Sequence, residues 1–132
     1  MKLIVQIPCY NEEATLPLVV NSIPRIIPGI DKVETMIIDD GSRDKTDHLL
    51  IELTRRDHHL RFLRLSRNTG QWAAISAGFS ASRGDYVIVM DGDLQHAPED
   101  IHLLIEKMAE GYLYSICLFC NRSFDLHSPA LF

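Results

Sequence analysis

The chain has 132 residues, of which 46% are hydrophobic and 23% charged, and its formal net charge is -5. This length and composition are typical of one ordinary globular domain that can bury a core, and they argue against a second domain. The negative charge argues against a nucleic-acid-binding protein that works through a basic face, because neutralising phosphates requires clustered lysine and arginine.

The sequence shows no sign of export or membrane insertion. Its three cysteines, Cys9, Cys117 and Cys120, form no disulfide pattern, which favours a reducing compartment. Residues 1–8 are too short and too soon interrupted to be a secretory signal, and no apolar run approaches the roughly 18 residues of a membrane span. We therefore expect a cytoplasmic protein with no transmembrane segment in this chain.

The chain begins with a short apolar run followed by a helical pattern. The run from Leu3 to Ile7 predicts a central strand that Pro8 ends. Thr15 is placed to cap a helix that begins near Leu16, with a proline tolerated in the first turn. These residues predict a first βα unit.

A second unit of the same kind follows. Residues 33–38 predict a second strand, which leads into an acidic turn. The next helix, which Asp44 or Thr46 can cap, places Leu49, Leu50 and Leu53 on one face.

The second half of the chain repeats the alternation. Residues 61–65 predict a third, more exposed strand, and residues 71–82 predict an alanine-rich helix that can pack closely on the sheet and that Gly84 closes. Residues 86–90 predict a strand buried on both faces, and residues 98–111 a last helix. Four strands alternating with four helices predict an α/β fold with a mostly parallel sheet and right-handed crossovers.

Polar side chains follow three of the four expected strands. The first strand leads to Tyr10, Asn11 and Glu12, the second to residues 39–42, and the fourth to residues 91–93. Because parallel strands end at one edge of a sheet, we expect the three sets to meet where open α/β sheets bind ligands.

Asp91 and Asp93 are the strongest candidates for a metal site. Two carboxylates one residue apart repel each other unless a cation lies between them, and oxygen ligands suit a hard divalent ion such as Mg2+ or Mn2+. Cys117 and Cys120 could be half of a zinc site or a redox pair, but a lone pair of cysteines is a weak signal and coincidence is the better reading.

Four motifs occur in a fixed order along the chain. They are Pro8-x-Tyr10-Asn11-Glu12-Glu13, Asp39-Asp40-Gly41-Ser42-x-Asp44, Arg67-Asn68-x-Gly70 and Asp91-x-Asp93-x-Gln95. This series resembles the inverting GT-A glycosyltransferases of family 2. It looks most similar to the branch that makes polyprenyl-phosphate and dolichol-phosphate sugars, where an Asp-Leu-Gln-His sequence followed by a Pro-Glu pair is typical.

The resemblance implies a role for each matching residue. It implies that residues from the first two motifs line the nucleotide pocket: Pro8, Tyr10, Asn11 and Glu12, with Asp39 and Asp40 holding the base and ribose. It implies that Arg67 and Gly70 border the diphosphate. Asp91 would face the sugar and ribose, Asp93 would be the principal metal ligand, and Gln95 would join the metal shell.

The implied activity is transfer of a sugar, with inversion, from a UDP- or GDP-sugar to a polyprenyl phosphate or a glycan, aided by Mg2+ or Mn2+. A bound divalent ion would neutralise the charge that grows on the departing diphosphate. A lipid-phosphate acceptor at the inner face of the membrane is already anionic near neutral pH and demands no strong general base, whereas a hydroxyl acceptor needs one.

The sequence departs from the family in three places. Thr69 stands where an aromatic residue is usual, Trp72 stands where a shorter residue is usual, and residues 113–132 do not follow the usual valine-rich continuation. We therefore expect residues 1–111 to form the nucleotide-sugar-binding portion and residues 112–132 a divergent or truncated tail. The alternative function is a truncated, catalytically silent remnant that binds the nucleotide and turns over nothing.

Two other enzyme classes fit the sequence less well. A phosphatase that uses an Asp-x-Asp pair usually carries it on an early strand, with a threonine where Gln95 stands. A dinucleotide-binding oxidoreductase would need a Gly-x-Gly-x-x-Gly sequence after the first strand, which is missing here.

Overall fold

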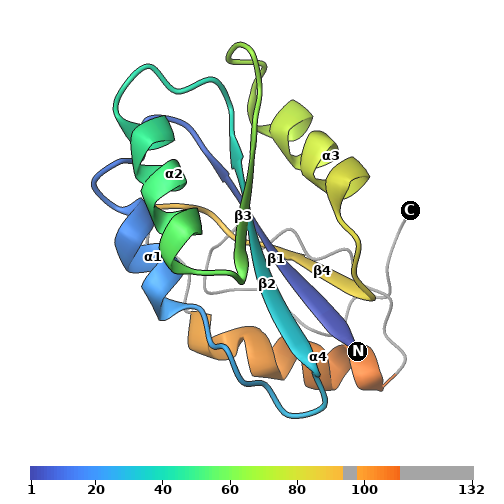
Figure 1. Cartoon of the computed structure of the whole chain (residues 1–132). Coiled ribbons are helices and arrows are strands. Elements are labelled where there is room, and N and C mark those ends of the chain that lie inside the picture. Colours follow the sequence, from blue (N-terminus) through green and yellow to red (C-terminus); the bar gives the residue numbers. More distant parts are fainter. Residues whose placement is uncertain (94–97, 111–132) are drawn as a thin grey trace.

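The computed structural model of the chain describes residues 1–93 and 98–110 (Figure 1). Within them strands and helices alternate along the chain. The elements are β1 (Lys2–Cys9), α1 (Leu16–Ser22), β2 (Lys32–Asp39), α2 (Thr46–Arg56), β3 (Leu60–Arg64), α3 (Gln71–Ala81), β4 (Tyr86–Val89), the 3-10 turn η1 (Pro98–Asp100) and α4 (Ile101–Ala109).

The four strands form one parallel sheet in the order β3-β2-β1-β4. β1 is central, because it pairs with β2 from Lys2 to Cys9 and with β4 from Leu3 to Gln6. The predicted α/β fold with a parallel sheet is therefore confirmed. All four strands end at the same edge, which is the edge where the polar motifs were expected to meet.

Helices cover both faces of the sheet (Figure 1). Alternate residues of β1, including Val5 and Ile7, pack with apolar residues of α1, α2 and α4, such as Leu16, Leu50 and Ile101. The other face of the sheet packs on α3. This division follows from the strand geometry, since successive side chains point to opposite faces.

Pro8 does not end β1, as the sequence had suggested, because the strand continues to Cys9. The carbonyl of Gln6 faces β4 and accepts the N–H of Met90, so Pro8, two residues later, faces the same side. Pairing with β4 stops at Gln6, whereas pairing with β2 continues through Pro8 and Ile38. The N–H that proline lacks would therefore point to a side where the ladder has already ended.

Two expected helix caps are wrong. Thr15 precedes α1, but its hydroxyl makes no capping bond and lies near Glu12 and Gly92 instead. Gly84 does not close α3, which leaves its helical path at Ser82 in an extended conformation. Gly84 is needed for space, since a Cβ there would lie 2.7 Å from Cγ1 of Ile4.

α3 packs closely on the sheet, as its small residues predicted. A Cβ at Gly78 would lie 2.4 Å from the side chain of Gln6, which is completely buried on β1. Nε2 of Gln6 donates a hydrogen bond of 2.8 Å to the carbonyl of Ile75. The glycine and this hydrogen bond together fix the distance between α3 and the central strand.

Some expectations fall on residues that the structure does not describe. They include the expected metal ligand Gln95 and the tail at residues 112–132. In the part of the chain that is described, no helix combines the length and the apolar character needed to traverse a bilayer.

Candidate functional site

A cavity of about 310 Å3 opens at the carboxyl edge of the sheet. Its wall comes from the ends of β1, β2 and β4 and from the first turn of α3. The lining residues are Pro8, Cys9, Tyr10, Glu12, Asp40, Gln71, Ala74, Asp91, Gly92 and Asp93. The three polar sets that follow β1, β2 and β4 therefore contribute to one cavity, as the strand order predicts.

The side chains of Asp39 and Asp40 lie on opposite faces of the sheet, although the two residues are consecutive. Asp39 is the last residue of β2 and is 0% exposed, and its partners lie in the turn before α2 and on β3. Asp40 has its partners in the loop before α3 and lines the cavity. The alternation of side chains along an extended strand accounts for this separation.

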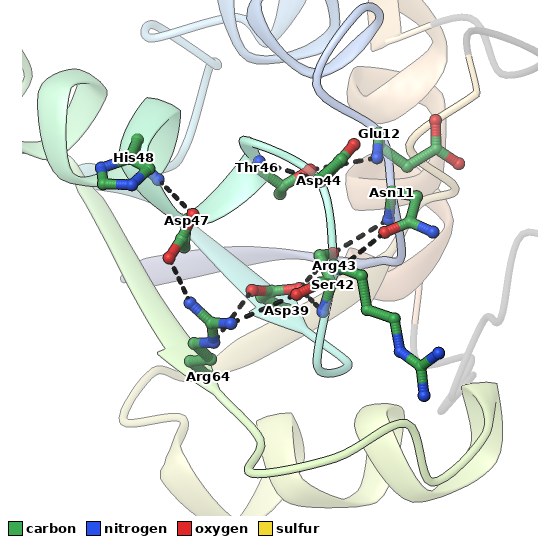
Figure 2. Close-up of polar contacts among 10 residues, drawn as sticks. All are labelled: Asn11, Glu12, Asp39, Ser42, Arg43, Asp44, Thr46, Asp47, His48 and Arg64. Atoms are coloured by element: carbon green, nitrogen blue, oxygen red, sulfur yellow. Dashed lines mark hydrogen bonds and ion pairs between the residues drawn. The ribbon is translucent and has the colours of Figure 1, made fainter.

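Asp39 organises the turn that follows β2 (Figure 2). Its Oδ1 accepts hydrogen bonds from the backbone N–H and from the hydroxyl of Ser42. Ser42 Oγ in turn accepts the backbone N–H of Asn11 at 2.9 Å, and the Asn11 side-chain oxygen accepts the N–H of Arg43 at 2.9 Å. Asn11 has a φ of 53°, a left-handed conformation that asparagine tolerates better than most residues. These bonds join the loop after β1 to the loop after β2.

Arg64 holds the outer side of this network (Figure 2). Oδ2 of Asp39 accepts no hydrogen bond within the described residues, but it lies 3.6 Å from Nε of Arg64. The same guanidinium donates to the carboxylate of Asp47 on α2 and to the carbonyl of Ser42 at 3.2 Å. Its hydrogen bond is the main reason that the pKa of Asp47 is lowered, and the N–H of His48 adds to the effect. Arg64 thus connects β3, the buried Asp39 and α2.

A second set of hydrogen bonds joins the segment after β1 to the segment after β4. The hydroxyl of Thr15 lies 2.8 Å from Oε2 of Glu12 and 2.8 Å from the carbonyl oxygen of Gly92. Because Gly92 separates Asp91 from Asp93, this contact fixes the backbone between the two carboxylates. The N–H of Glu12 donates to Oγ1 of Thr46 at 3.2 Å, which also ties the loop to the start of α2.

Asp91 and Asp93 fit the chemistry of a magnesium or manganese site. Asp91 is half-buried, Asp93 is exposed, and both line the cavity. Residues 1–93 and 98–110 contain no group of three or more His, Cys, Asp or Glu side chains that could hold a metal ion. Mg2+ is commonly bound through one or two carboxylates, with substrate phosphates and water completing the shell, so two carboxylates at an open cavity suit it. Bound there, such an ion would supply Lewis-acid neutralisation of a diphosphate.

Of the other site residues predicted from the sequence, only some line the cavity. Pro8, Tyr10, Glu12 and Asp40 line the cavity with the two aspartates. Asn11, Asp39, Arg67 and Gly70 are not among the lining residues. Arg67 is exposed, and its backbone lies against Gly41, where a Cβ would be 2.5 Å from the Arg67 carbonyl carbon.

For three residues of this region, no functional role was predicted from the sequence. Gln71 lines the cavity and donates from Nε2 to Oδ1 of Asp91 at 3.1 Å. Cys9 also lines it, and Arg64 supports Asp39 from outside. Gln71 directly follows the Arg67-Asn68-x-Gly70 motif, and this adjacency could have marked it as a site residue. Nothing in the sequence distinguishes Arg64 from the other basic residues of its strand.

Several solved structures are similar to this fold. The mannosyltransferase PcManGT from Pyrobaculum calidifontis, in complex with GDP-Man and Mn2+, has a TM-score of 0.72 and 21% identity over 84% of this chain and 33% of its own. Residues 1-349 of S. aureus TarS, in complex with UDP-GlcNAc, give a TM-score of 0.66 and 24% identity over 83% of this chain and 32% of that one.

A third structure has slightly higher sequence identity. Glucosyl-3-phosphoglycerate synthase from Mycobacterium tuberculosis, in complex with Mn2+, UDP and glucosyl-3-phosphoglycerate, gives a TM-score of 0.63 and 26% identity over 81% of this chain and 39% of its own. This chain spans 20% of a longer TarS structure and between 32% and 39% of the three structures just described.

These likenesses identify the fold as the Rossmann-like N-terminal portion of the GT-A fold. The sequence match is broader than the described structure and includes most of residues 112–132. Because residues 4–127 match the family described as glycosyl transferase family 2, the chain belongs to that family.

Proposed function

We propose that this chain forms the donor site of an inverting glycosyltransferase that uses a UDP- or GDP-sugar with Mg2+ or Mn2+. The observation that carries the proposal is the meeting of Glu12, Asp40, Asp91 and Asp93 at one cavity, although they come from three strands. A hollow lined by carboxylates repels a bare diphosphate, so a divalent cation is the chemistry that reconciles this cavity with a nucleotide sugar.

The proposed roles are those that the motif resemblance implies, and for Pro8, Tyr10, Glu12, Asp91 and Asp93 their place at the cavity supports them. Asp93, exposed at the cavity, is the principal metal ligand, with Gln95 as a further ligand, and Asp91 faces the ribose and sugar of the donor. Pro8, Tyr10, Asn11 and Glu12 form the wall for the nucleotide, and Arg67 and Gly70 border the diphosphate.

Asp39 and Asp40 are proposed to hold the base and ribose. Asp40 is supported by its position in the cavity wall, whereas Asp39 is 0% exposed and faces the side of α2, so its role rests on the sequence motif. The guanidinium of Arg64 lies 3.6 Å from Oδ2 of Asp39.

The neighbours support the donor and the metal. Those structures hold UDP-GlcNAc, UDP or GDP-Man, two of them with Mn2+. For the acceptor we propose a polyprenyl phosphate at the membrane surface or a glycan, on the strength of the sequence motifs.

Calorimetry of the full chain with UDP and with GDP, each with and without Mn2+, tests this proposal. We expect one nucleoside diphosphate to bind, and to need Mn2+ to do so, whereas UMP and GMP should show little dependence on the ion because they lack the β-phosphate. Failure of both diphosphates to bind in the presence of Mn2+ would contradict the proposal.

Turnover separates an active transferase from a silent nucleotide-binding protein. The chain is incubated with the matching nucleotide sugar and a polyprenyl phosphate, and release of the nucleoside diphosphate is measured. Release that depends on the acceptor supports the transferase; tight Mn2+-dependent binding with no release supports the silent remnant.

A further inference from the structure

A chain of hydrogen bonds links Asp40 to Asp91 along the cavity wall. The carboxylate of Asp40 accepts the backbone N–H of Thr69 at 2.9 Å, the hydroxyl of Thr69 at 2.7 Å and the N–H of Gly70 at 2.9 Å. The next residue, Gln71, begins α3 and donates from Nε2 to Oδ1 of Asp91 at 3.1 Å. Asp40, Gln71 and Asp91 all line the same cavity.

Hydrogen bonds are the main restraint on the segment that places Gln71. Residues 66–70 are all exposed, so burial does little to hold them. Gly70 has a φ of +95°, and a Cβ there would meet nothing within 4 Å. Glycine is therefore needed at position 70 for its backbone conformation and not to make room for a neighbouring group. The Asp40 carboxylate accepts the two successive N–H groups of Thr69 and Gly70 at this turn.

We propose that Gln71 is a positioning residue of the donor site and that Asp40 has a second role, which is to set the place of Gln71. This inference rests on the proposed function, in which Asp91 faces the ribose and sugar of the donor. The Gln71 amide fixes the direction of the Asp91 carboxylate before the donor arrives, so less ordering is left for the binding step. Asp40 acts on this pair at a distance, through the backbone of Thr69 and Gly70.

A double-mutant cycle measures whether Gln71 acts through Asp91. The affinity of the full chain for UDP and GDP with Mn2+ is compared among the unaltered protein, Gln71→Met, Asp91→Ala and the double variant. Methionine has nearly the length of glutamine but no N–H to donate. We expect Gln71→Met to weaken binding about tenfold when Asp91 is present and less than about twofold when it is absent. Equal losses in both backgrounds would overturn the inference.

Two further variants control for the volume of the side chain at position 71 and for the stability of α3. Gln71→Glu keeps the length of the side chain but sets a second carboxylate against Asp91, so it should weaken binding more than Gln71→Met does. Ser80→Ala, on the exposed face of the same helix, should leave the affinity unchanged. If Gln71→Glu binds as well as the unaltered chain, the side-chain amide has no positioning role.

A second measurement needs no nucleotide. The side-chain NH2 signals of Gln71 in nitrogen-15 NMR should exchange faster with solvent in Asp91→Ala and in Asp40→Ala. The Gln6 side chain is the internal control, because its Nε2 is bound to the Ile75 carbonyl inside the sheet and its signals should not change while the fold is intact. If Asp40→Ala also changes the Gln6 signals, Thr69→Val replaces it, since valine removes only the hydroxyl donor to Asp40.

The outcomes separate this inference from the function on which it rests. The proposed link from Asp40 to Asp91 would be overturned if the Gln71 signals were unchanged in Asp91→Ala. It would also be overturned if they were unchanged in both Asp40→Ala and Thr69→Val, even if the nucleotide binds. Absence of nucleotide binding by the unaltered protein would overturn the proposed function and the donor role together, whatever the NMR signals show.

Discussion

The backbone N–H of Asn11 donates a 2.9 Å hydrogen bond to Oγ of Ser42, so the loops after β1 and β2 are joined by one serine hydroxyl. The same hydroxyl donates to Asp39, which is completely buried. One small side chain therefore satisfies two partners on different elements.

Ser42→Ala should lower the free energy of unfolding by about 1–3 kcal/mol, because it leaves the Asn11 N–H without its acceptor and removes one of two Ser42 donors from Asp39. Urea unfolding followed by circular dichroism measures the change. Ser80→Ala is the control, since that serine is exposed on α3, and its effect should stay within about 0.5 kcal/mol. Equal effects of the two substitutions would show that the Ser42 contacts contribute nothing.

Gly41→Ala should be more destabilising than Gly29→Ala by about 1–3 kcal/mol. Both glycines have a positive φ, +71° and +81°, so alanine is strained at either position. Only at Gly41 does a Cβ also overlap backbone, lying 2.5 Å from the carbonyl carbon of Arg67, whereas nothing lies within 4 Å at Gly29. The same unfolding measurement decides, and similar losses at the two sites would contradict the close approach.

Asp93→Asn should abolish Mn2+-dependent nucleotide binding while the fold stays intact. Asp93 is exposed, so its carboxylate is not needed for the core, but losing a charged ligand should weaken affinity more than about 100-fold, which is about 2.8 kcal/mol. Calorimetry with the preferred nucleotide measures the affinity, and circular dichroism verifies the fold. Glu52→Gln, which removes an exposed carboxylate on α2, should bind as the unaltered chain does. An unchanged affinity in Asp93→Asn would rule out the metal assignment.

Cys9 should make the fold less stable as the pH rises above about 8.5. Burial raises the pKa of the Cys9 thiol, and the nearby carboxylates of Asp39, Glu12, Asp44 and Asp40 raise it further. The unfolded chain then loses the thiol proton while the folded chain keeps it, so the contribution of Cys9 should fall by about 1.4 kcal/mol per pH unit above that point.

Subtraction isolates this effect from other titrating groups. The free energy of unfolding is measured from pH 7 to pH 10 for the unaltered chain and for Cys9→Ala, and the difference between them should shrink with rising pH. In a Cys117→Ser, Cys120→Ser background, the folded chain should also react slowly with a thiolate-specific reagent at pH 8. A constant difference together with fast labelling would mean that Cys9 ionises as an ordinary exposed cysteine does.

The sequence was sufficient for the order of elements because β1 and β4 contain compact apolar runs, β2 has one near its end, β3 alternates apolar and basic residues, and a polar break follows each strand. Strand ends were predicted to within one or two residues. The largest error was at Pro8, where a local rule about proline was applied without knowledge of how far β4 extends along β1.

The convergence of the site could also be predicted, because parallel strands bring their carboxyl ends together whatever their separation in the chain. The partners of individual side chains could not. Asp39 and Asp40 are adjacent acids in the sequence, yet one is bound by Ser42 and faces Arg64, while the other holds the loop before α3. Which face each one serves depends on the register of β2, and that register is set by pairing with β1 and β3.

The central position of β1 has a consequence for the order of folding. Leu3 pairs with Val33 on one side and with Tyr86 on the other, so the second partner is synthesised long after the first. A chain leaving the ribosome can pair β1 with β2, and β2 with β3, while β4 is still being made. Long-range pairings such as that of β1 with β4 are slow to form. Asp91 and Asp93 therefore reach the cavity in a late step, and until then the edge of β1 that pairs with β4 leaves its backbone N–H and C=O groups open to pairing with another chain.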